Sequence, residues 1–518
     1  MTAAGTPDDR DVVPRWRPFG LTVRSGETAP LARRALLREP SDLSEPEAAF
    51  RESPGNYTAA DLVGAAFATS TRSELAMEAA RCLADDPDAG AAPRDLARAL
   101  LDWAAYGPRL QEETDPPHLD FLAVRQRAGQ LRRIVRAEPR NAVRWADLAL
   151  AHTVLGHPLQ AEREIRTALA IAGPNRFLLR AAARLYVHMD RLDDAHDLLV
   201  RDPSVLEDPW LAAAELATAT LAGRTSRYTR RARQLVDDGE GHAPRHLSEL
   251  ASQVATAELR AGRARHAKRL MAVALREPTE NALAQAEWAS ANGLTLHKAN
   301  LEGPRTYEAR ALRFSHAGDW AAASAAGMEW LADQPFAQEA AQFTSYAASV
   351  GAEDWALAQR AAEAGLVANP DDHMLRNNLV FALANQDRVT EAYDHLRLIP
   401  WTHVTGRERA VLVATEGLML FRFGQAEDGR RQYRAAINAL NQLGEPNLAA
   451  LATAFWAREE IMAGTEQVGQ AVTEAKQVAA STRFPAAELW TQRLTGLSVP
   501  KAHVVTPPPQ RPSPTSWS

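Results

Sequence analysis

Residue types that perform catalysis or bind metals are sparse in this sequence. The nearest pair of metal ligands is His242 and His246 in GHAPRH, a spacing that places two imidazoles on one face if the segment is helical. Pro244 separates them and no nearby carboxylate completes a ligand set, so a solvated turn is favoured. The single cysteine, Cys82, follows an arginine on an Ala-rich stretch, where a small packing residue is commoner than a nucleophile. The sequence also lacks a Gly-rich phosphate loop, HExxH and GxSxG. We therefore expect a non-enzymatic protein without catalytic residues, cofactor or metal.

Arginine clusters are the strongest candidates for a charged binding surface. One cluster, Arg125, Arg132 and Arg136, recurs at spacings close to whole helical turns. Two more lie in GRTSRYTRRARQL and RAGRARHAKRL, and their candidate contact residues are Arg227, Arg230, Arg231, Arg265, Lys268 and Arg269. Three interpretations are open: an ordinary solvated helix face, an acidic protein partner, or nucleic acid. The first is favoured.

The bulk composition is typical of a folded chain. The sequence has 518 residues, of which 46% are hydrophobic and 24% charged, with a net charge of -6. This length suits roughly three ordinary domains or one extended repeat array. One cysteine excludes an intrachain disulfide, and no secretory signal or bilayer-length apolar run is visible. We expect a cytoplasmic protein that does not bind membranes.

The elements that carry these residues repeat along the chain. In the frame that starts at Pro304, positions 4, 8, 11, 15, 20, 27 and 32 are Tyr307, Ala311, Phe314, Gly318, Ala323, Trp330 and Pro335. The frame that starts at Ala142 repeats this order of small, large and glycine positions, and so does the one at His373. Weaker matches start at Arg176, Pro209, Ser248, Ala410 and Ala450, and one at Gln338 needs a one-residue slip.

This pattern resembles the tetratricopeptide repeat (TPR) family, whose unit of 34 residues is a helix, a turn and a second helix. Small residues at positions 8 and 20 let the two helices approach closely, larger residues fill the space between neighbours, and the proline ends the second helix. The resemblance, which covers most of 142–482, implies an all-α, right-handed TPR-like α-solenoid of antiparallel helix pairs.

The chain divides into six segments. Residues 1–57 are rich in Pro, Gly and charge and are expected to form an extended or partly ordered arm, and 58–137 a helical cap. TPR-like modules are expected at 138–293 and 304–482, separated by an interruption at 294–303 where one unit is cut short. The Pro/Ser-rich end, 483–518, is predicted to be a disordered tail.

The resemblance also implies a concave wall that binds protein partners, built from positions 2, 5, 9, 12 and 13 of each first helix. In the units at 304 and 373 the candidate residues, with Asn378 added, are Arg305, Glu308, Leu312, Ser315, His316, Met374, Asn377, Asn378, Phe381 and Asn385. Amide side chains can bind the backbone of an extended peptide while apolar ones contact its side chains. Only Asn378 matches the family's five-residue carboxylate clamp, so binding of chaperone tails is not implied.

The arm carries a second candidate contact, Trp16 and Phe19. It either orders on a partner or folds back onto its own solenoid, and both remain open. The Ala/Arg-rich composition indicates a GC-rich bacterial source. We expect a scaffold or adaptor that recruits a protein partner within a bacterial multi-protein system. The alternative is a nucleic-acid-associated subunit that uses the arginine clusters. The partner's identity and the oligomeric state are left open.

Overall fold

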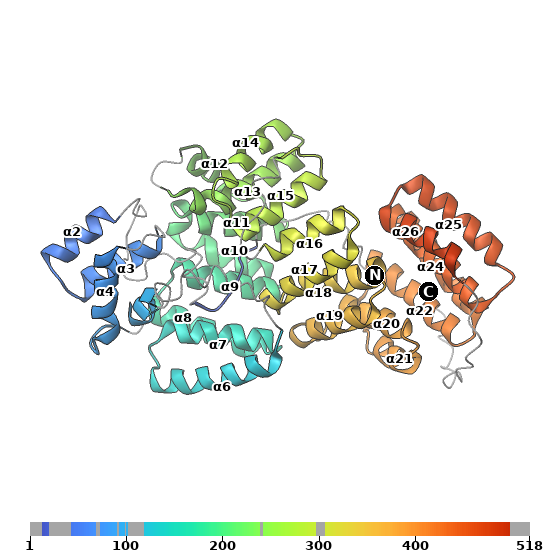
Figure 1. Ribbon diagram of the computed structural model, residues 1–518, viewed down its shortest axis with the longest axis horizontal. Helices are drawn as coiled ribbons and strands as arrows, with labels where there is room; N and C mark the ends of the chain where they lie inside the picture. The colour runs from blue at the N-terminus through green and yellow to red at the C-terminus, as the bar shows by residue number, and fades with distance from the viewer. Residues whose placement is uncertain are drawn as a thin grey trace.

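The computed structural model describes residues 13–19, 43–68, 73–90, 93–98, 100–101, 119–238, 242–296 and 306–497. All regular elements in these ranges are helices, and consecutive helices pack as antiparallel pairs along a curved array (Figure 1). The fold is the all-α, TPR-like solenoid that the sequence predicts. Among the helices of these ranges, none combines the length and the apolar character needed to cross a bilayer.

The helices fall into three consecutive groups. The N-terminal group contains α2 (Ser44–Glu52), α3 (Asn56–Ala68), α4 (Glu74–Asp85) and α6 (Phe121–Ala137). The middle group contains α7 (Ala142–Val154), α8 (Pro158–Ala172), α9 (Arg176–His188), α10 (Leu192–Val200), η1 (Pro203–Leu206), α11 (Pro209–Leu221), α12 (Thr229–Asp238), α13 (Pro244–Arg260), α14 (Ala264–Ala274), α15 (Glu280–Ala291), α16 (Tyr307–His316), α17 (Trp320–Asp333), α18 (Gln338–Tyr346), η3 (Ala347–Gly351) and α19 (Trp355–Ala368). The C-terminal group contains α20 (His373–Ala384), α21 (Val389–Arg397), η4 (Trp401–His403), α22 (Gly406–Arg422), α23 (Ala426–Gln442), α24 (Pro446–Ala463), α25 (Val468–Thr482), α26 (Pro485–Arg493) and η5 (Leu494–Gly496).

The turn inside each helix pair follows the repeat frame. Position 15 adopts a left-handed backbone, with φ between 56° and 76°, at Gly156, Asp190, Gly223, Gly262, Gly318, Asp387, Gly424 and Gly464. Glycine reaches this region without steric cost, and aspartate is one of the few other residues that tolerate it. The eight turns therefore share the register that the sequence pattern predicts.

Close helix approach at positions 8 and 20 is most evident between α22 and α23. A β-carbon on Gly417 would lie 2.9 Å from the carbonyl oxygen of Gly429, and one on Gly429 would lie 2.6 Å from the ring of Phe421. In the better-matching units alanines hold these positions, and Ala149, Ala161, Ala311 and Ala323 are fully buried. The small residues thus set the spacing within each pair.

A π-helix explains the one-residue slip in the unit that starts at Gln338. The segment η3 (Ala347–Gly351) continues α18 with one wider turn, which accommodates one extra residue. The left-handed turn residue that follows is Glu353, one position later than in the other units. The insertion is therefore a feature of the backbone, and the register resumes after it.

The middle group coils until its two ends meet. The turn after α7 packs on the end of α19, so that a β-carbon on Gly156 would lie 2.3 Å from the carbonyl oxygen of Val367. The Arg184 guanidinium of α9 lies 5.0 Å from the ring centre of Phe336 and 3.7 Å from the Glu339 carboxylate. Helices α7 to α19 therefore enclose a central space.

Both ends of the chain contain more ordered structure than the sequence indicates. Helix α2 forms within the segment expected to be an extended arm, and it buries Phe50 against the N-terminal helices. Helix α26 forms within the segment expected to be a disordered tail, and it buries Trp490 at 1% exposure. The indole of Trp490 donates to the carbonyl oxygen of Val350 at 2.8 Å. Both helices are held by contacts remote in sequence, which composition does not reveal. Residues 498–518 lie outside the described ranges.

Candidate peptide-binding groove

Residues 13–19, here called the arm segment, lie inside the coil formed by α7 to α19, as the dark-blue stretch beside α9 (Figure 1). The side chains of Arg15, Trp16, Arg17 and Phe19 are buried, with exposures of 8%, 2%, 3% and 2%. We use "groove" for the residues that contact this segment: Asp147, Phe177, Glu280, Asn281, Glu308, Asp333 and Phe336. They come from α7, α9, α15, α16 and α17 and the loop after α17.

Asp333, the last residue of α17, is the centre of the polar contacts. Arg17 donates to it through two nitrogens, at 2.9 Å to Oδ1 and 2.8 Å to Oδ2. Such a two-pronged contact matches the planar guanidinium to the carboxylate and is stronger than a single hydrogen bond. Arg15 lies 3.4 Å from the same carboxylate. These are the only cations within 4.0 Å of Asp333 in the described ranges.

Two further carboxylates, Glu308 of α16 and Glu280 of α15, contact the arginines. Arg15 donates to Glu308 of α16 at 2.5 Å and to the amide oxygen of Asn281 at 2.8 Å. Arg17 lies 3.4 Å from Glu280 at the start of α15. Because all of these side chains are buried, each charge is stabilised by its partners rather than by water.

Side chains also bind the backbone of the arm segment near both of its ends. The Asn281 amide donates to the carbonyl oxygen of Val13 at 3.0 Å. The backbone N–H of Phe19 donates to the Asp147 carboxylate of α7 at 2.8 Å. Backbone contacts of this kind hold an extended segment whatever its side chains are. The groove therefore combines general backbone binding with the specific contacts made to the two arginines.

Aromatic contacts fix the remaining side chains. Trp16 meets Phe336 edge to face with ring centres 6.0 Å apart, and Phe19 meets Phe177 in the same way at 5.2 Å. The ring of His188 also packs edge to face against Phe336, with ring centres 5.6 Å apart. The indole nitrogen of Trp16 has no hydrogen-bond acceptor among the described residues. The slot for Trp16 therefore recognises an aromatic shape and not an indole N–H.

The charged groups of the groove have perturbed pKa values. Burial would raise the pKa of Glu280, but Arg17, Arg245 and Arg15 together lower it to about 2. Burial raises the pKa of Asp147, and this effect exceeds the opposite effects of the Phe19 N–H and of Arg144. The charged form of Glu280 is thus stabilised by its neighbouring cations, whereas burial disfavours the charged form of Asp147.

A second layer of ion pairs positions the groove residues. Arg180 of α9 donates to Glu249 at 2.8 Å and lies 4.7 Å from the ring centre of Trp210. Glu249 in turn accepts from Asn281 at 2.9 Å. Asn281 therefore contacts the arm segment on one side and α13 on the other, so its orientation is set by both.

Of the candidate concave residues in the unit that starts at 304, some lie in the groove and others lie outside it. Glu308 lies in the groove, and Leu312 is buried in the core beside it. Ser315 is half-buried and His316 is exposed at the end of α16. Arg305 lies outside the described residues.

The candidate residues of the unit at 373 lie in the C-terminal group, away from the arm segment. Met374, Asn377, Asn378 and Phe381 are buried. Phe381 contacts Phe455 of α24 with ring centres 5.0 Å apart, and Asn378 donates to the Ser345 hydroxyl at 2.8 Å.

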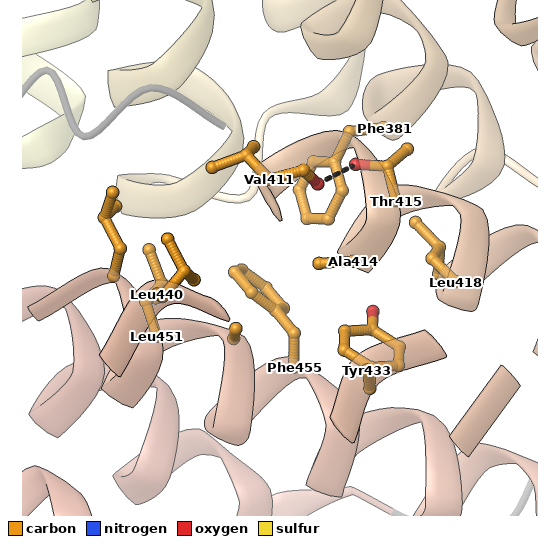
Figure 2. A pocket seen from close by; sticks show the side chains of 11 residues that line it. Phe381, Val411, Ala414, Thr415, Leu418, Tyr433, Leu440, Leu451 and Phe455 are labelled. Carbon is orange, nitrogen blue, oxygen red and sulfur yellow. Dashed lines mark hydrogen bonds between the residues drawn. The ribbon is translucent and has the colours of Figure 1, made fainter. Parts of the chain in front are cut away.

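Phe381 is covered by Phe455 of α24, and α20 also packs on α18, α19 and α22. Asn385, at the end of α20, stays half-buried and accepts from Arg422 at 3.3 Å. A small apolar cavity remains between Phe381, Val411, Tyr433 and Phe455 (Figure 2), with a volume of about 20 Å³. This is room for about one water molecule, and its lining offers almost no polar partner.

The two alternatives for the arm are distinguished in this structure. Trp16 contacts Phe336 and Phe19 contacts Phe177 of the same chain, so the described part of the arm that carries them folds back. Residues 13–19 lie inside the coil of α7 to α19 and do not cap an end of the solenoid. Sequence reasoning left this open because nothing in residues 1–57 pairs visibly with Asp333 or Phe336, which are more than 300 positions away.

The basic clusters stay at the surface. Arg227, Arg230, Arg265, Lys268 and Arg269 are exposed and Arg231 is half-buried on α12, α14 and the turns before them. Arg269 pairs with Asp237 at 3.0 Å, and Arg231 donates to the carbonyl oxygen of Leu206 at 2.8 Å. Arg230, Arg265 and Lys268 have no ion pair among the described residues. The two helices pack through one shared core, which brings their charges onto neighbouring surfaces.

The other reactive residue types have ordinary surroundings. His246 lies on α13 and is buried against Trp210 of α11. It does not lie in the solvated turn that the sequence favours. Cys82 is exposed rather than packed. In the ranges that the structure describes, no three His, Cys, Asp or Glu side chains gather to hold a metal ion.

The repeat frame could have found one further groove residue, Phe177, and several residues that surround the groove. In the unit that starts at Arg176, positions 2, 5 and 9 are Phe177, Arg180 and Arg184, and position 2 of the unit at Ser248 is Glu249. These are concave positions of the weaker units. Asp333 and Phe336 lie at the end of a second helix and in the following loop, so the frame gives no signal for them.

The class of protein that this fold and groove define is a helical-repeat protein that binds a mostly non-helical segment of its own chain in its interior. No protein-family model matches the sequence, and no curated protein sequence matches it either. The structure is similar to that of a chain in the APC/C hetero-tetramer Cut9-Hcn1, with 15% identity, a TM-score of 0.37, and coverage of 87% of this chain and 92% of that one. It is also similar to yeast Tom70, with 10% identity, a TM-score of 0.28, and coverage of 88% and 98%.

Proposed function

We propose that this chain is a non-enzymatic scaffold or adaptor that recruits a protein partner by binding an extended segment in its solenoid groove, as a subunit of a bacterial multi-protein system. The observation that supports this is the arm segment itself. Its backbone is bound by Asn281 and Asp147, and its side chains by carboxylates and aromatic rings. A groove that binds one extended segment through its backbone has the contacts needed to bind another.

The test is capture of partners from the native host by the full chain. One variant carries Glu308→Lys and Asp333→Lys in the groove. The control carries Glu466→Lys, a glutamate exposed in the turn between α24 and α25. We expect a partner that is recovered with the parent and with the control but lost with the groove variant. Circular dichroism checks that the groove variant is folded. Equal recovery with all three proteins would place the partner elsewhere on the surface.

A second candidate function, association with nucleic acid, is supported by the exposed and unpaired cations Arg230, Arg265 and Lys268 on the neighbouring helices α12 and α14. Contacts to phosphate would make affinity fall by about 10³ or more between 50 and 200 mM salt if six or more phosphates are bound. Charge reversal at Arg230, Arg265 and Lys268 should then abolish binding. If the reversed variant bound nucleic acid as well as the parent, this candidate would be discarded.

A further inference from the structure

The groove is selective for a positively charged occupant. Three of its four carboxylates, Glu280, Glu308 and Asp333, meet the two arginines of the arm segment. The fourth, Asp147, accepts from the backbone N–H of Phe19. Glu280 also has Arg245 at 3.8 Å and Asp147 has Arg144 at 3.4 Å.

Asp333 differs from these carboxylates. In the described ranges both of its cations come from the arm segment. A buried carboxylate without a cation is strongly disfavoured, so a neutral or acidic segment could not replace this one.

The groove also fits a particular spacing of the two positive charges in its occupant. Arg15 and Arg17 both reach Asp333, while Trp16 between them points to Phe336. Alternation of this kind requires an extended backbone, in which successive side chains point to opposite sides. The groove therefore selects the order cation, aromatic, cation.

A second aromatic contact extends this pattern. Phe19 fills the site beside Phe177, two residues after Arg17. Pro18, between them, is exposed.

Each anchor of the arm segment comes from elements far away in sequence. The separations range from 128 residues for the Phe19 contact with Asp147 to 320 for the Trp16 contact with Phe336. The segment is joined to α2 through residues 20–42 only. The arm segment therefore makes the contacts of a bound peptide, although it belongs to the same chain.

We propose that the groove is a recognition site for extended peptide segments of the type Arg-aromatic-Arg-x-Phe, and that residues 13–19 are its intramolecular occupant, which the corresponding segment of a partner protein replaces. This inference rests on the proposed function and names the chemistry of the partner. A partner must compete with a segment that is covalently attached. Partner binding is therefore strongest when the arm segment is cut or weakened.

The experiment uses the full chain with a specific protease site inserted between residues 25 and 38. The protein is purified folded, cut, and mixed with a fluorescein-labelled peptide of residues 11–22, DVVPRWRPFGLT. Fluorescence anisotropy follows binding of the label. We expect saturable binding to the cut protein and none to the uncut one. A scrambled peptide of the same composition is the control.

Variant peptides test which side chains are recognised. Replacing Arg15 and Arg17 by alanine should weaken binding at least 100-fold, and Trp16→Ala at least 10-fold. Trp16→Phe should change it less than 10-fold, because the indole N–H has no acceptor among the described residues. Equal binding of the alanine and parent peptides would overturn the proposed specificity.

A second protein variant keeps the test independent of cutting. The uncut chain with Arg15→Ala and Arg17→Ala should bind the labelled parent peptide, because its own segment competes poorly. Sedimentation velocity on the same samples detects exchange of arms between copies. A concentration-dependent dimer of the uncut parent would show that a second copy is the occupant, against the proposal.

Three results separate this inference from the function on which it rests. If the cut protein stays folded but never exchanges its segment, or unfolds when the segment leaves, the arm is a permanent part of the core and the inference is wrong. If a partner is captured through the groove but the peptide does not bind, the inference fails while the proposed function stands. If the peptide binds but no partner is captured, the recognition site stands and the scaffold function fails.

Discussion

Arg17 and Asp333 form a two-pronged ion pair, with nitrogen–oxygen distances of 2.9 and 2.8 Å, across 316 residues of sequence. The pair is buried, since the two side chains are only 2% and 9% exposed. It joins the arm to the last turn of α17, where the partial negative charge of the helix end adds to the attraction for a cation. It is one of several contacts that place the arm segment in the groove.

We expect strong coupling between these two residues in a double-mutant cycle. Arg17→Ala and Asp333→Ala should each lower the free energy of unfolding by roughly 3–5 kcal/mol, because each leaves a buried charge without its partner. The double variant should lose clearly less than the sum of the two. Urea denaturation followed by circular dichroism measures all three. The exposed pair Arg388 and Glu391, 2.6 Å apart, is the control and should couple by less than about 0.5 kcal/mol. Equal coupling in both pairs would contradict the buried geometry.

Two glycines at the same repeat position should respond oppositely to alanine. Gly429→Ala places a methyl group 2.6 Å from the ring of Phe421 and 2.8 Å from the carbonyl oxygen of Gly417. We expect a loss of about 1–3 kcal/mol from overpacking. Gly469→Ala meets nothing within 4 Å and should be neutral or stabilising by up to about 1 kcal/mol, because alanine favours a helix. Thermal and chemical unfolding measure both. A similar loss for both variants would rule out close approach of α22 and α23 as the cause.

Two histidines, His246 buried and His188 half-buried, should make the fold less stable in mild acid. Burial lowers the pKa of His246 to about 4, and burial with the nearby Arg184 lowers that of His188 to about 4. Both are neutral in the folded protein, whereas in the unfolded chain they take up a proton near pH 6.5. Their contribution to stability is therefore complete above pH 6.5 and decreases as the pH falls from 6.5 to 4, by about 1.4 kcal/mol per pH unit and per histidine.

Urea denaturation at pH 7 and pH 5 tests this sign. The parent should lose about 2 kcal/mol more on acidification than His246→Gln, and about 4 kcal/mol more than the double variant His188→Gln/His246→Gln. The comparison is between pH values within each variant, so the cost of the substitution itself cancels. The same pH dependence in all three proteins would contradict burial of the neutral rings.

The C-terminal helix should contribute measurably to stability. Trp490→Ala removes a side chain that is 1% exposed and in contact with Phe455 at 4.7 Å, and should cost roughly 3–5 kcal/mol. Trp490→Phe keeps most of that packing and loses the hydrogen bond to Val350, at a cost of about 1 kcal/mol, because Arg493 still donates to the same carbonyl oxygen at 3.1 Å. If neither variant changes the unfolding free energy, the segment from 483 onward is a tail after all.

Much of the repeat architecture could be predicted because its signals are local. Gly318 and Ala311 mark a turn and a close helix contact within a few residues of each other, and the same spacing returns in other units. The one-residue slip near Gln338 was visible as well, although its cause, a π-helix, was not. The concave positions include Glu308, which contacts the arm segment, but the burial of Phe381 against Phe455 of α24 does not follow from the repeat frame. Helix α24 comes from a later unit, and its approach depends on the curvature of the whole array.

The sequence by itself determined the helices, their pairing and the register of the turns, because these follow from contacts between residues fewer than 34 positions apart. Only the tertiary structure decided that the coil closes on itself and that residues 13–19 lie within it. Those contacts join Arg15 to Glu308 and Arg17 to Asp333 across about 300 residues, and they arise only when the repeats have curved far enough to bring α7 and α19 together.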